Sequence, residues 1–192
     1  MNNNYLNLLA KEILQEVPQG LSKVRFAKIL YFVHKGLVQR EKNDLDAVRF
    51  IRMPLGPVPV GFKELINDKD IQVIETATNP LIYDKQVYKL KDELSISNIR
   101  TEAIKKILSL LISFTTSELV TIAHREPTWL NHRNGDEYYL SDQDLVIPLP
   151  SKGGKKMDRD LDNQHLQAKL VEGMLNDIVD ESTTLEYPEY KN

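Results

Sequence analysis

Hydrophobic residues recur at helical spacing over three long stretches of the chain, residues 5–17, 22–39 and 99–114. In each stretch the apolar positions follow the i, i+3, i+4 pattern of a helix with one buried face. The second stretch is apolar over a wide arc, which predicts a central helix contacted on more than one side. In the third stretch, the residues expected to face inward are Ile99, Ala103, Ile104, Ile107, Leu108, Leu111 and Ile112.

Alternation of apolar and polar residues predicts strands over residues 47–53, 70–76 and 86–90. Asn79-Pro80 is a turn signal between the last two. We therefore expect a small antiparallel β element in which these two strands pair with each other or with the first strand. The prolines of residues 54–60 predict no regular structure there, and a short helix should follow over residues 60–66. The predicted fold class is α+β, mainly α-helical.

A fourth helix is predicted from its boundary signals. Thr115 and Glu118 have the spacing of a capping box, in which two side chains satisfy free amide groups at a helix start. Pro127 biases the preceding residue away from helical geometry. The helix should therefore cover about residues 116–125.

The end of this helix brings His124, Glu126 and the only tryptophan, Trp129, into one small region. Polar side chains grouped beside a tryptophan at a helix end can form a functional site. A lone tryptophan is more often a core anchor whose indole N–H reaches a partner. We expect Trp129 to be mostly buried, with His124 and Glu126 hydrogen-bonded around the helix end.

The last part of the chain is predicted to be separate from a domain that covers residues 1–150. Residues 151–157 include Gly153-Gly154 and are expected to form a flexible joint. Residues 158–192 then carry an amphipathic helix and an acidic tail, which its own domain or a partner can cover. The candidate partner-binding residues in this part are Leu166, Leu170, Met174, Ile178, Tyr187 and Tyr190.

Composition narrows the function classes. The chain has 192 residues, no cysteine and a net charge of -3. The lack of cysteine excludes disulfides, thiolate zinc sites and cysteine nucleophiles, and it fits a cytoplasmic protein. No signal peptide is expected, because residues 1–5 are not a basic segment followed by an apolar run. No membrane contact is expected, because residues 107–114, the longest apolar stretch, are too few to span a bilayer. The acidic balance argues against a general nucleic-acid binder.

Two kinds of chemistry remain as alternatives. His124, Glu126, His132 and Asp136 include metal-ligand types, but their spacing matches no known metal or catalytic motif. We therefore predict no catalytic, cofactor-binding or metal-binding residues. A DNA contact would use two groups of basic residues, although basic residues grouped in this way usually just face the solvent. These residues are Lys23, Arg25, Lys28, Lys35, Lys152, Lys155, Lys156 and Arg159.

Three segments in order resemble a known family. They are LSKVRFAKILYFVHKGL at 21–37, LGPVPVGFKEL at 55–65 and SELVTIAHREPTW at 117–129. This order resembles the Panacea domain, also called the SocA-like antitoxin domain, over about residues 5–150. The chain departs from the family pattern at Leu55, where an aromatic residue is usual, at Ala123, where threonine is usual, and at Thr128, which separates Pro127 from Trp129.

The resemblance implies a helical domain with a small β element and no enzymatic activity. It implies a bacterial antitoxin, often carried by a prophage or another mobile element, that neutralises a cognate protein toxin by direct binding. A protease and the chain's own promoter DNA are left open as further partners. The alternative is a transcriptional or phage-related regulator that contacts DNA. Structural roles are expected for the motif residues His34, Gly56, Pro57, His124, Glu126 and Trp129.

Overall fold

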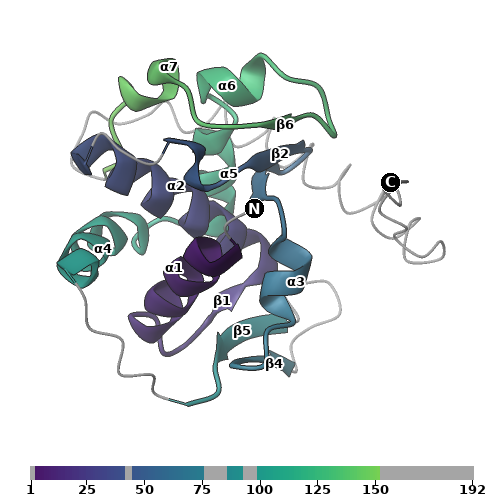
Figure 1. Ribbon diagram of the computed structural model, residues 1–192, viewed down its shortest axis with the longest axis vertical. Coiled ribbons are helices and arrows are strands. Elements are labelled where there is room, and N and C mark those ends of the chain that lie inside the picture. The colour runs from purple at the N-terminus through teal and green to yellow at the C-terminus, as the bar shows by residue number, and fades with distance from the viewer. Residues whose placement is uncertain (1–2, 42–44, 76–85, 93–98, 152–192) are drawn as a thin grey trace. The chain divides into compact units, whose positions relative to one another are not determined.

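The structure is a computed structural model that describes residues 3–41, 45–75, 86–92 and 99–151 (Figure 1). All of them belong to one unit of the chain, Met1–Gly154. Apart from Ser151, the predicted joint and the C-terminal helix with its candidate partner-binding residues lie outside the described residues. The predicted domain boundary after residue 150 therefore stays a prediction.

The described part of this unit contains four helices of eight or more residues, and all were predicted to within a few residues. They are α1 (Asn3–Gln15), α2 (Lys23–Glu41), α4 (Ile99–Leu111) and α5 (Thr116–Ala123). Shorter helical turns connect them: η1 (Leu45–Ala47), α3 (Phe62–Ile66), α6 (Pro127–Leu130) and α7 (Asp142–Leu145). Together with two small antiparallel sheets, these elements confirm the mainly α-helical α+β fold.

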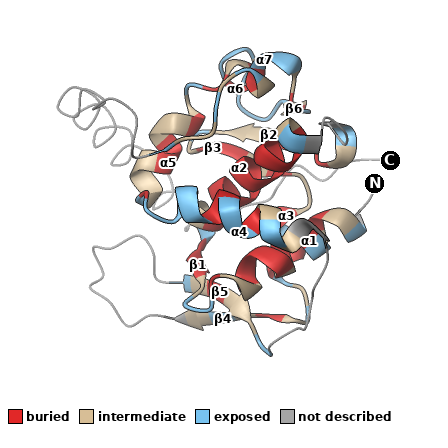
Figure 2. Cartoon of the chain, turned by 90° about the vertical axis from the view of Figure 1, so that its left-hand side faces the viewer, coloured by how far each residue is buried: buried red, intermediate tan, exposed pale blue. Residues whose placement is uncertain are grey.

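Helix α2 lies at the centre of the core, as its wide apolar arc predicted. Every residue from Phe26 to Val38 is buried (Figure 2). A helix buried on all sides needs neighbours on all sides, and α2 contacts α1, α4, α5, α7 and strands of both sheets. The helix thereby also buries polar residues at positions 28, 34 and 35.

The first sheet has the order β1-β5-β4. Its strands are β1 (Leu21–Ser22), β4 (Ile71–Glu75) and β5 (Gln86–Leu90). β4 and β5 pair with each other, antiparallel, from Ile71↔Leu90 to Glu75↔Gln86, which confirms one of the two predicted pairings. The short strand β1 was not predicted.

The second sheet has the order β3-β2-β6. Its strands are β2 (Phe50–Met53), β3 (Gly56–Pro59) and β6 (Glu137–Tyr138). β6 comes from a part of the chain almost ninety residues after β2, and residues 131–140 were not predicted to contain a strand. This sheet brings the loop after α6 back onto the β2–β3 hairpin.

Strand β3 corrects the prediction that residues 54–60 have no regular structure. The amide of Val60 donates to the carbonyl of Arg49 at 2.8 Å. The two-residue period of a strand then turns the nitrogens of Pro57 and Pro59 away from β2. Because β3 is an edge strand, these prolines remove no hydrogen bond from the sheet.

The end of α4 corrects a second prediction. The helix stops at Leu111 rather than at residue 114, and Ile112 is 38% exposed instead of facing inward. Among the described residues, no single helix has the length and hydropathy of a membrane span. The bent pair Thr101–Leu111 and Thr116–Ala123 has them only when its two helices are taken together.

Candidate functional site

Segments far apart in the sequence meet on one stripe of α2. Lys35 donates to Oε2 of Glu126 at 2.6 Å, and the hydroxyl of Tyr31 donates to the same oxygen at 3.2 Å. Lys35 and Tyr31 are 0% exposed and Glu126 is 2% exposed. A buried ion pair therefore joins α2 to the turn between α5 and α6.

Burial dominates the electrostatics of this pair. Removal from water raises the pKa of the Glu126 carboxyl above its usual value, against the opposing effect of the Lys35 ammonium. Burial also raises the pKa of Tyr31 well above its ordinary value, and the charge of Glu126 adds to that shift. The Tyr31 hydroxyl therefore keeps its proton and acts as a donor to Glu126.

The second contact of the stripe lies two helical turns away, at Lys28. Its ammonium nitrogen donates to the carbonyl oxygen of Pro57 at 2.6 Å, and the side chain is 1% exposed. Among the described residues no carboxylate pairs with Lys28 to offset the loss of water, so burial lowers its pKa to about 7. This contact joins α2 to the β2–β3 hairpin.

Gly56 makes this approach possible. Its φ of +99° is a conformation that side chains disfavour. A Cβ atom at this position would lie 2.9 Å from Cε of Lys28 and 3.3 Å from Cβ of Ala123. The Gly56-Pro57 turn is therefore packed between α2 and α5.

The turn between α5 and α6 presents Glu126 to α2. The predicted capping box is present: the Thr115 side chain accepts from the Glu118 amide, and the Glu118 side chain accepts from the Thr115 amide. Glu126 is extended, with φ -68° and ψ 130°, as expected for a residue before proline. Pro127 then starts a new helix, α6, because proline at the first helical position has no amide hydrogen to satisfy. This helix was not predicted from the sequence.

Trp129 follows within α6 and is 6% exposed, as predicted. Its indole N–H donates to the carbonyl of Met53 at 3.3 Å. His124 stacks on the ring at 4.2 Å between centroids. The guanidinium of Arg52 lies 3.8 Å from the ring centroid and also donates to the Trp129 carbonyl at 2.9 Å. Trp129 is thus an anchor between α6 and the end of β2.

The three segments joined in this way are the ones that carry the resemblance noted above. Residues 26–130, more than half of the chain, match the family described as antitoxin SocA-like, Panacea domain. The chain belongs to this family. Comparison with curated proteins and with solved structures gave no significant match.

The geometry assigns a place in the Panacea domain to each motif residue. Gly56 and Pro57 contact Lys28, Glu126 contacts Lys35, and His124 contacts Trp129. His34 is 0% exposed. The Nδ1 atom of His34 lies 3.3 Å from the hydroxyl of Tyr5, and its ring packs against Phe50. The Panacea motifs therefore meet inside the domain rather than at its surface.

A second buried carboxylate, Asp144, joins α6 to α7, and no described Lys or Arg forms an ion pair with it. It is 0% exposed. Oδ1 accepts from the Thr128 amide at 3.0 Å, and Oδ2 accepts from the amide and hydroxyl of Ser141, each at 2.8 Å, and from the Thr128 hydroxyl. Thr128, one of the three residues at which this chain departs from the family pattern, is therefore fixed by Asp144.

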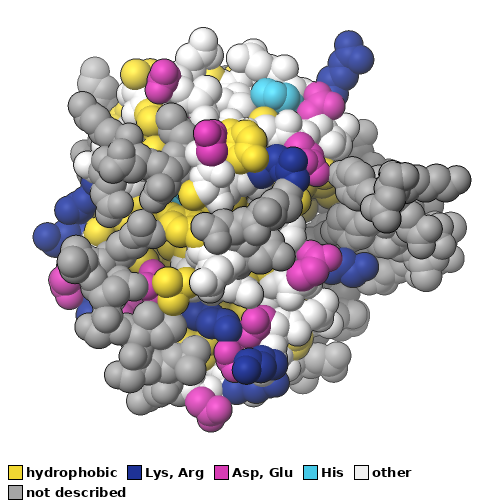
Figure 3. Space-filling model, viewed as in Figure 1, with side chains coloured by type: hydrophobic (Ala, Val, Ile, Leu, Met, Phe, Trp, Pro, Cys, Tyr) yellow, Lys and Arg dark blue, Asp and Glu magenta, His cyan; other side chains and the backbone are white. Residues whose placement is uncertain are grey.

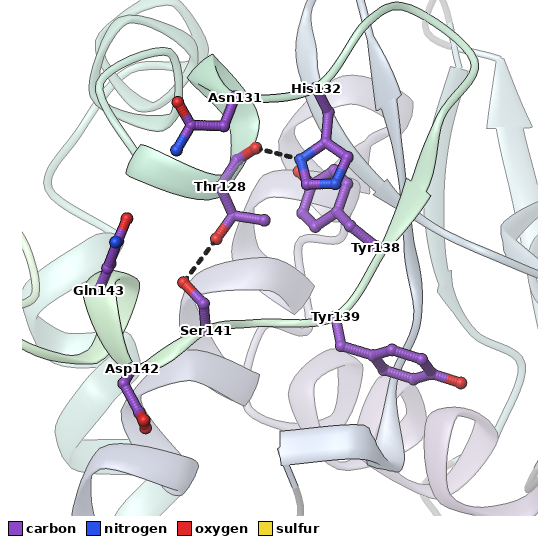
Figure 4. Close-up of a pocket in the computed structure, with 8 residues that line it drawn as sticks. All are labelled: Thr128, Asn131, His132, Tyr138, Tyr139, Ser141, Asp142 and Gln143. Atoms are coloured by element: carbon purple, nitrogen blue, oxygen red, sulfur yellow. Dashed lines mark hydrogen bonds between the residues drawn. The ribbon is translucent and has the colours of Figure 1, made fainter.

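A pocket of about 520 Å³ opens at the surface where α6, β6 and α7 meet. Its lining residues are Thr128, Asn131, His132, Tyr138, Tyr139, Ser141, Asp142 and Gln143. Figure 4 shows Thr128 and Ser141 near its centre and the ring of His132 over that of Tyr138. Because the family match ends at residue 130, most of this pocket lies outside the matched segment.

The residues considered as metal ligands have other partners. Glu126 pairs with Lys35, His124 stacks on Trp129, and His132 stacks on Tyr138 at 4.8 Å. The side chain of Asp136 accepts from the Arg133 amide at 2.7 Å. Within the described part of the chain, no three His, Cys, Asp or Glu side chains are placed to hold a metal ion.

The assignment of Lys28 and Lys35 to a solvated basic face was wrong. Both are buried, and Arg25 donates to the carbonyl of Ile112. A signal was present in the sequence: Lys28, Tyr31 and Lys35 share one face of a helix that is apolar on its other sides. Asp144 was also not predicted, although Ser141 and Asp144 have capping-box spacing.

On the face shown in Figure 3, the visible basic and acidic side chains are interspersed.

Proposed function

We propose that this chain is an antitoxin that binds a cognate protein toxin directly and neutralises it without catalysis. The observation that carries the proposal is its membership of the SocA-like Panacea family over residues 26–130. In this proposal the protein acts in the bacterial cytoplasm, and its gene lies beside the toxin gene on a prophage or another mobile element.

The positions of the motif residues support a binding role over a catalytic one. Lys35, Glu126 and His34 are at most 2% exposed, so a substrate has no access to them. We propose that His34, Gly56, Pro57, His124, Glu126 and Trp129 keep the domain in shape. The toxin is then bound by the exposed surface and by the C-terminal part of the chain.

The C-terminal candidates remain part of the proposal. Leu166, Leu170, Met174 and Ile178 have helical spacing, and Tyr187 and Tyr190 lie in the acidic tail. The full-length double variant Leu170→Asp/Met174→Asp should weaken neutralisation, because two charges would interrupt the apolar stripe. The matched variant His165→Asp/Asn176→Asp adds the same two charges on the opposite side of the predicted helix and should neutralise normally. Equal neutralisation by both variants would remove this segment from the interface.

The decisive experiment is a growth assay with the adjacent gene. Expression of its product alone should stop growth, and co-expression of this chain should restore it. The two proteins should also co-purify as a stable complex. A harmless neighbour, or a toxic one that this chain fails to neutralise, would refute the antitoxin proposal.

The DNA-binding alternative loses part of its basis. Two of the four cations on which it depended in α2, Lys28 and Lys35, are buried. A third, Arg25, is engaged with the carbonyl of Ile112 at 2.9 Å. The fourth, Lys23, is exposed. The other basic residues of that hypothesis, Lys152, Lys155, Lys156 and Arg159, lie outside the described residues. Retarded migration of promoter DNA at physiological salt would restore this alternative.

A further inference from the structure

The surface pocket between α6, β6 and α7 has the chemistry of a site for a positively charged, planar group. We propose that it receives an arginine side chain of the partner protein. This inference rests on the proposed antitoxin function for the identity of that partner. The pocket itself can be tested without the partner.

Charge is the first argument. Asp142 is the only lining side chain with a formal charge. It is exposed, and no ion pair joins it to another described residue. The segment around it, residues 131–147, contains four acidic residues and one basic residue. A basic group is therefore the complementary occupant.

Flat rings are the second argument. The ring of His132 stacks on that of Tyr138 at 4.8 Å with an interplanar angle of 29°. Nδ1 of His132 donates to the Thr128 carbonyl at 2.6 Å, which fixes the orientation of the ring. Tyr139 is 41% exposed beside this pair. Because Tyr138 is only 5% exposed, His132 and Tyr139 are the rings on which a guanidinium group can stack, whereas an ammonium group does not match a ring face in shape.

Hydrogen-bond acceptors are the third argument. Figure 4 shows Asn131 and Gln143 on one side of the pocket and the His132–Tyr138 pair on the other, with Asp142 and Tyr139 at its lower rim. Amide oxygens and a carboxylate can together accept the five N–H groups of a guanidinium. An arginine that enters between the two sides would find acceptors and ring faces at the same time.

The surrounding surface favours a protein as the source of this arginine. Leu130, Tyr139 and Val146 are 59%, 41% and 81% exposed. These side chains lie on or next to the three elements that form the pocket, and apolar surface around a pocket favours contact with a protein. Most of the pocket also lies beyond residue 130, where the family match ends, so it can differ between family members that bind different toxins.

The test uses the full-length ¹⁵N-labelled protein and Nα-acetyl-arginine amide as the probe. Addition of the probe should shift backbone amide resonances of residues 128–143. Nα-acetyl-citrulline amide has nearly the same shape without the charge and should cause much smaller shifts. Asp142→Asn should weaken arginine binding about three- to fivefold, as loss of an exposed ion pair does. Tyr139→Leu should weaken it as well.

Glu102→Gln is the matched control, because it removes an exposed carboxylate on α4, far from the pocket in the sequence. It should leave arginine binding unchanged. Equal shifts with the citrulline probe, shifts outside residues 128–143, or normal binding by both pocket variants would overturn the proposal. If arginine binds as expected but growth rescue fails, the pocket stands and the antitoxin function fails. If rescue succeeds without arginine binding, only the pocket proposal fails.

Discussion

Helix α2 buries two lysines two turns apart, and the two ends of this stripe are stabilised in different ways. At one end Lys35 meets the carboxylate of Glu126 at 2.6 Å. At the other end Lys28 meets only the carbonyl oxygen of Pro57, also at 2.6 Å. The matched pair keeps opposite charges together inside the core. The unmatched lysine has a pKa lowered to about 7 and can become neutral. Equal burial therefore has different consequences for charge.

The difference also separates two kinds of structural role. The Lys35 end joins α2 to a turn whose conformation depends on Pro127, and its stability depends on two opposite charges. The Lys28 end joins α2 to a hairpin whose conformation depends on Gly56, and its stability depends on close packing. The following predictions test this contrast, from the largest expected effect to the smallest.

Removal of one member of the buried ion pair should have the largest effect. Lys35→Met leaves the Glu126 carboxylate buried without a cation, so the free energy of unfolding should fall by about 3–5 kcal/mol. The double variant Lys35→Met/Glu126→Leu should lose less than the sum of the two single variants. Urea unfolding measures all three. Lys105→Met, at an exposed ion pair with Glu102, is the control and should cost less than about 1 kcal/mol.

Truncation of Trp129 tests whether the contact between Lys35 and Glu126 depends on the packing of the neighbouring Trp129 side chain. Trp129→Ala should destabilise the protein by about 3–5 kcal/mol, as truncation of a large buried side chain does. The adjacent Leu130 is 59% exposed, and Leu130→Ala should change stability by about 0.5 kcal/mol or less. A Trp129→Ala protein with unchanged thermal stability but no neutralisation would show that Trp129 contacts the partner instead.

Gly56→Ala tests packing at the Lys28 end. The φ of +99° alone should cost about 1–3 kcal/mol, and crowding of Lys28 should add to it. Gly135→Ala provides the matched control, because Gly135 has a φ of +90° and nothing within 4 Å of the added Cβ. Equal losses of unfolding free energy in the two variants would mean that Lys28 moves aside without cost.

The pH dependence of stability tests the unmatched charge of Lys28. Between its folded pKa of about 7 and the ordinary value of 10.5, the unfolded state binds more protons, so stability rises with pH. From pH 7 to pH 9 the gain should be about 2 kcal/mol. Lys28→Met should lack this gain in urea unfolding at the two pH values. Identical pH profiles for the two proteins would contradict a lowered pKa of Lys28.

The smallest effect is expected for Tyr31→Phe. Loss of the hydroxyl removes one donor to Glu126, but Lys35 remains bound to the same oxygen. The free energy of unfolding should fall by about 0.5–1.5 kcal/mol. Tyr139→Phe, at a side chain that is 41% exposed, should have no measurable effect. A loss as large as that of Lys35→Met would mean that Tyr31, and not the ion pair, holds this end together.

The local features of the fold were accessible from the sequence alone. Periodicity predicted the three longest helices, and the capping box at Thr115 and Glu118 predicted where α5 begins. Pro127 determined that Glu126 leaves helical geometry. These features depend on neighbours within a few residues, so the information is present in a short window. The burial of Trp129 was predicted from its residue type, because a lone tryptophan is most often a core anchor, but its partners Met53 and Arg52 were not.

Features that depend on distant partners were decided only by the tertiary structure. Pro57 and Pro59 occupy a strand because β3 lies at the edge of its sheet, a position that no local pattern reveals. Lys28 and Lys35 are buried because Pro57 and Glu126, respectively 29 and 91 residues away, supply their acceptors. A lysine in a helix carries the same local signal whether it faces water or a buried oxygen. Residue types and short-range spacing thus determined the long helices and strands β4 and β5. Long-range contacts determined the edge strand β3 and which polar side chains lie inside.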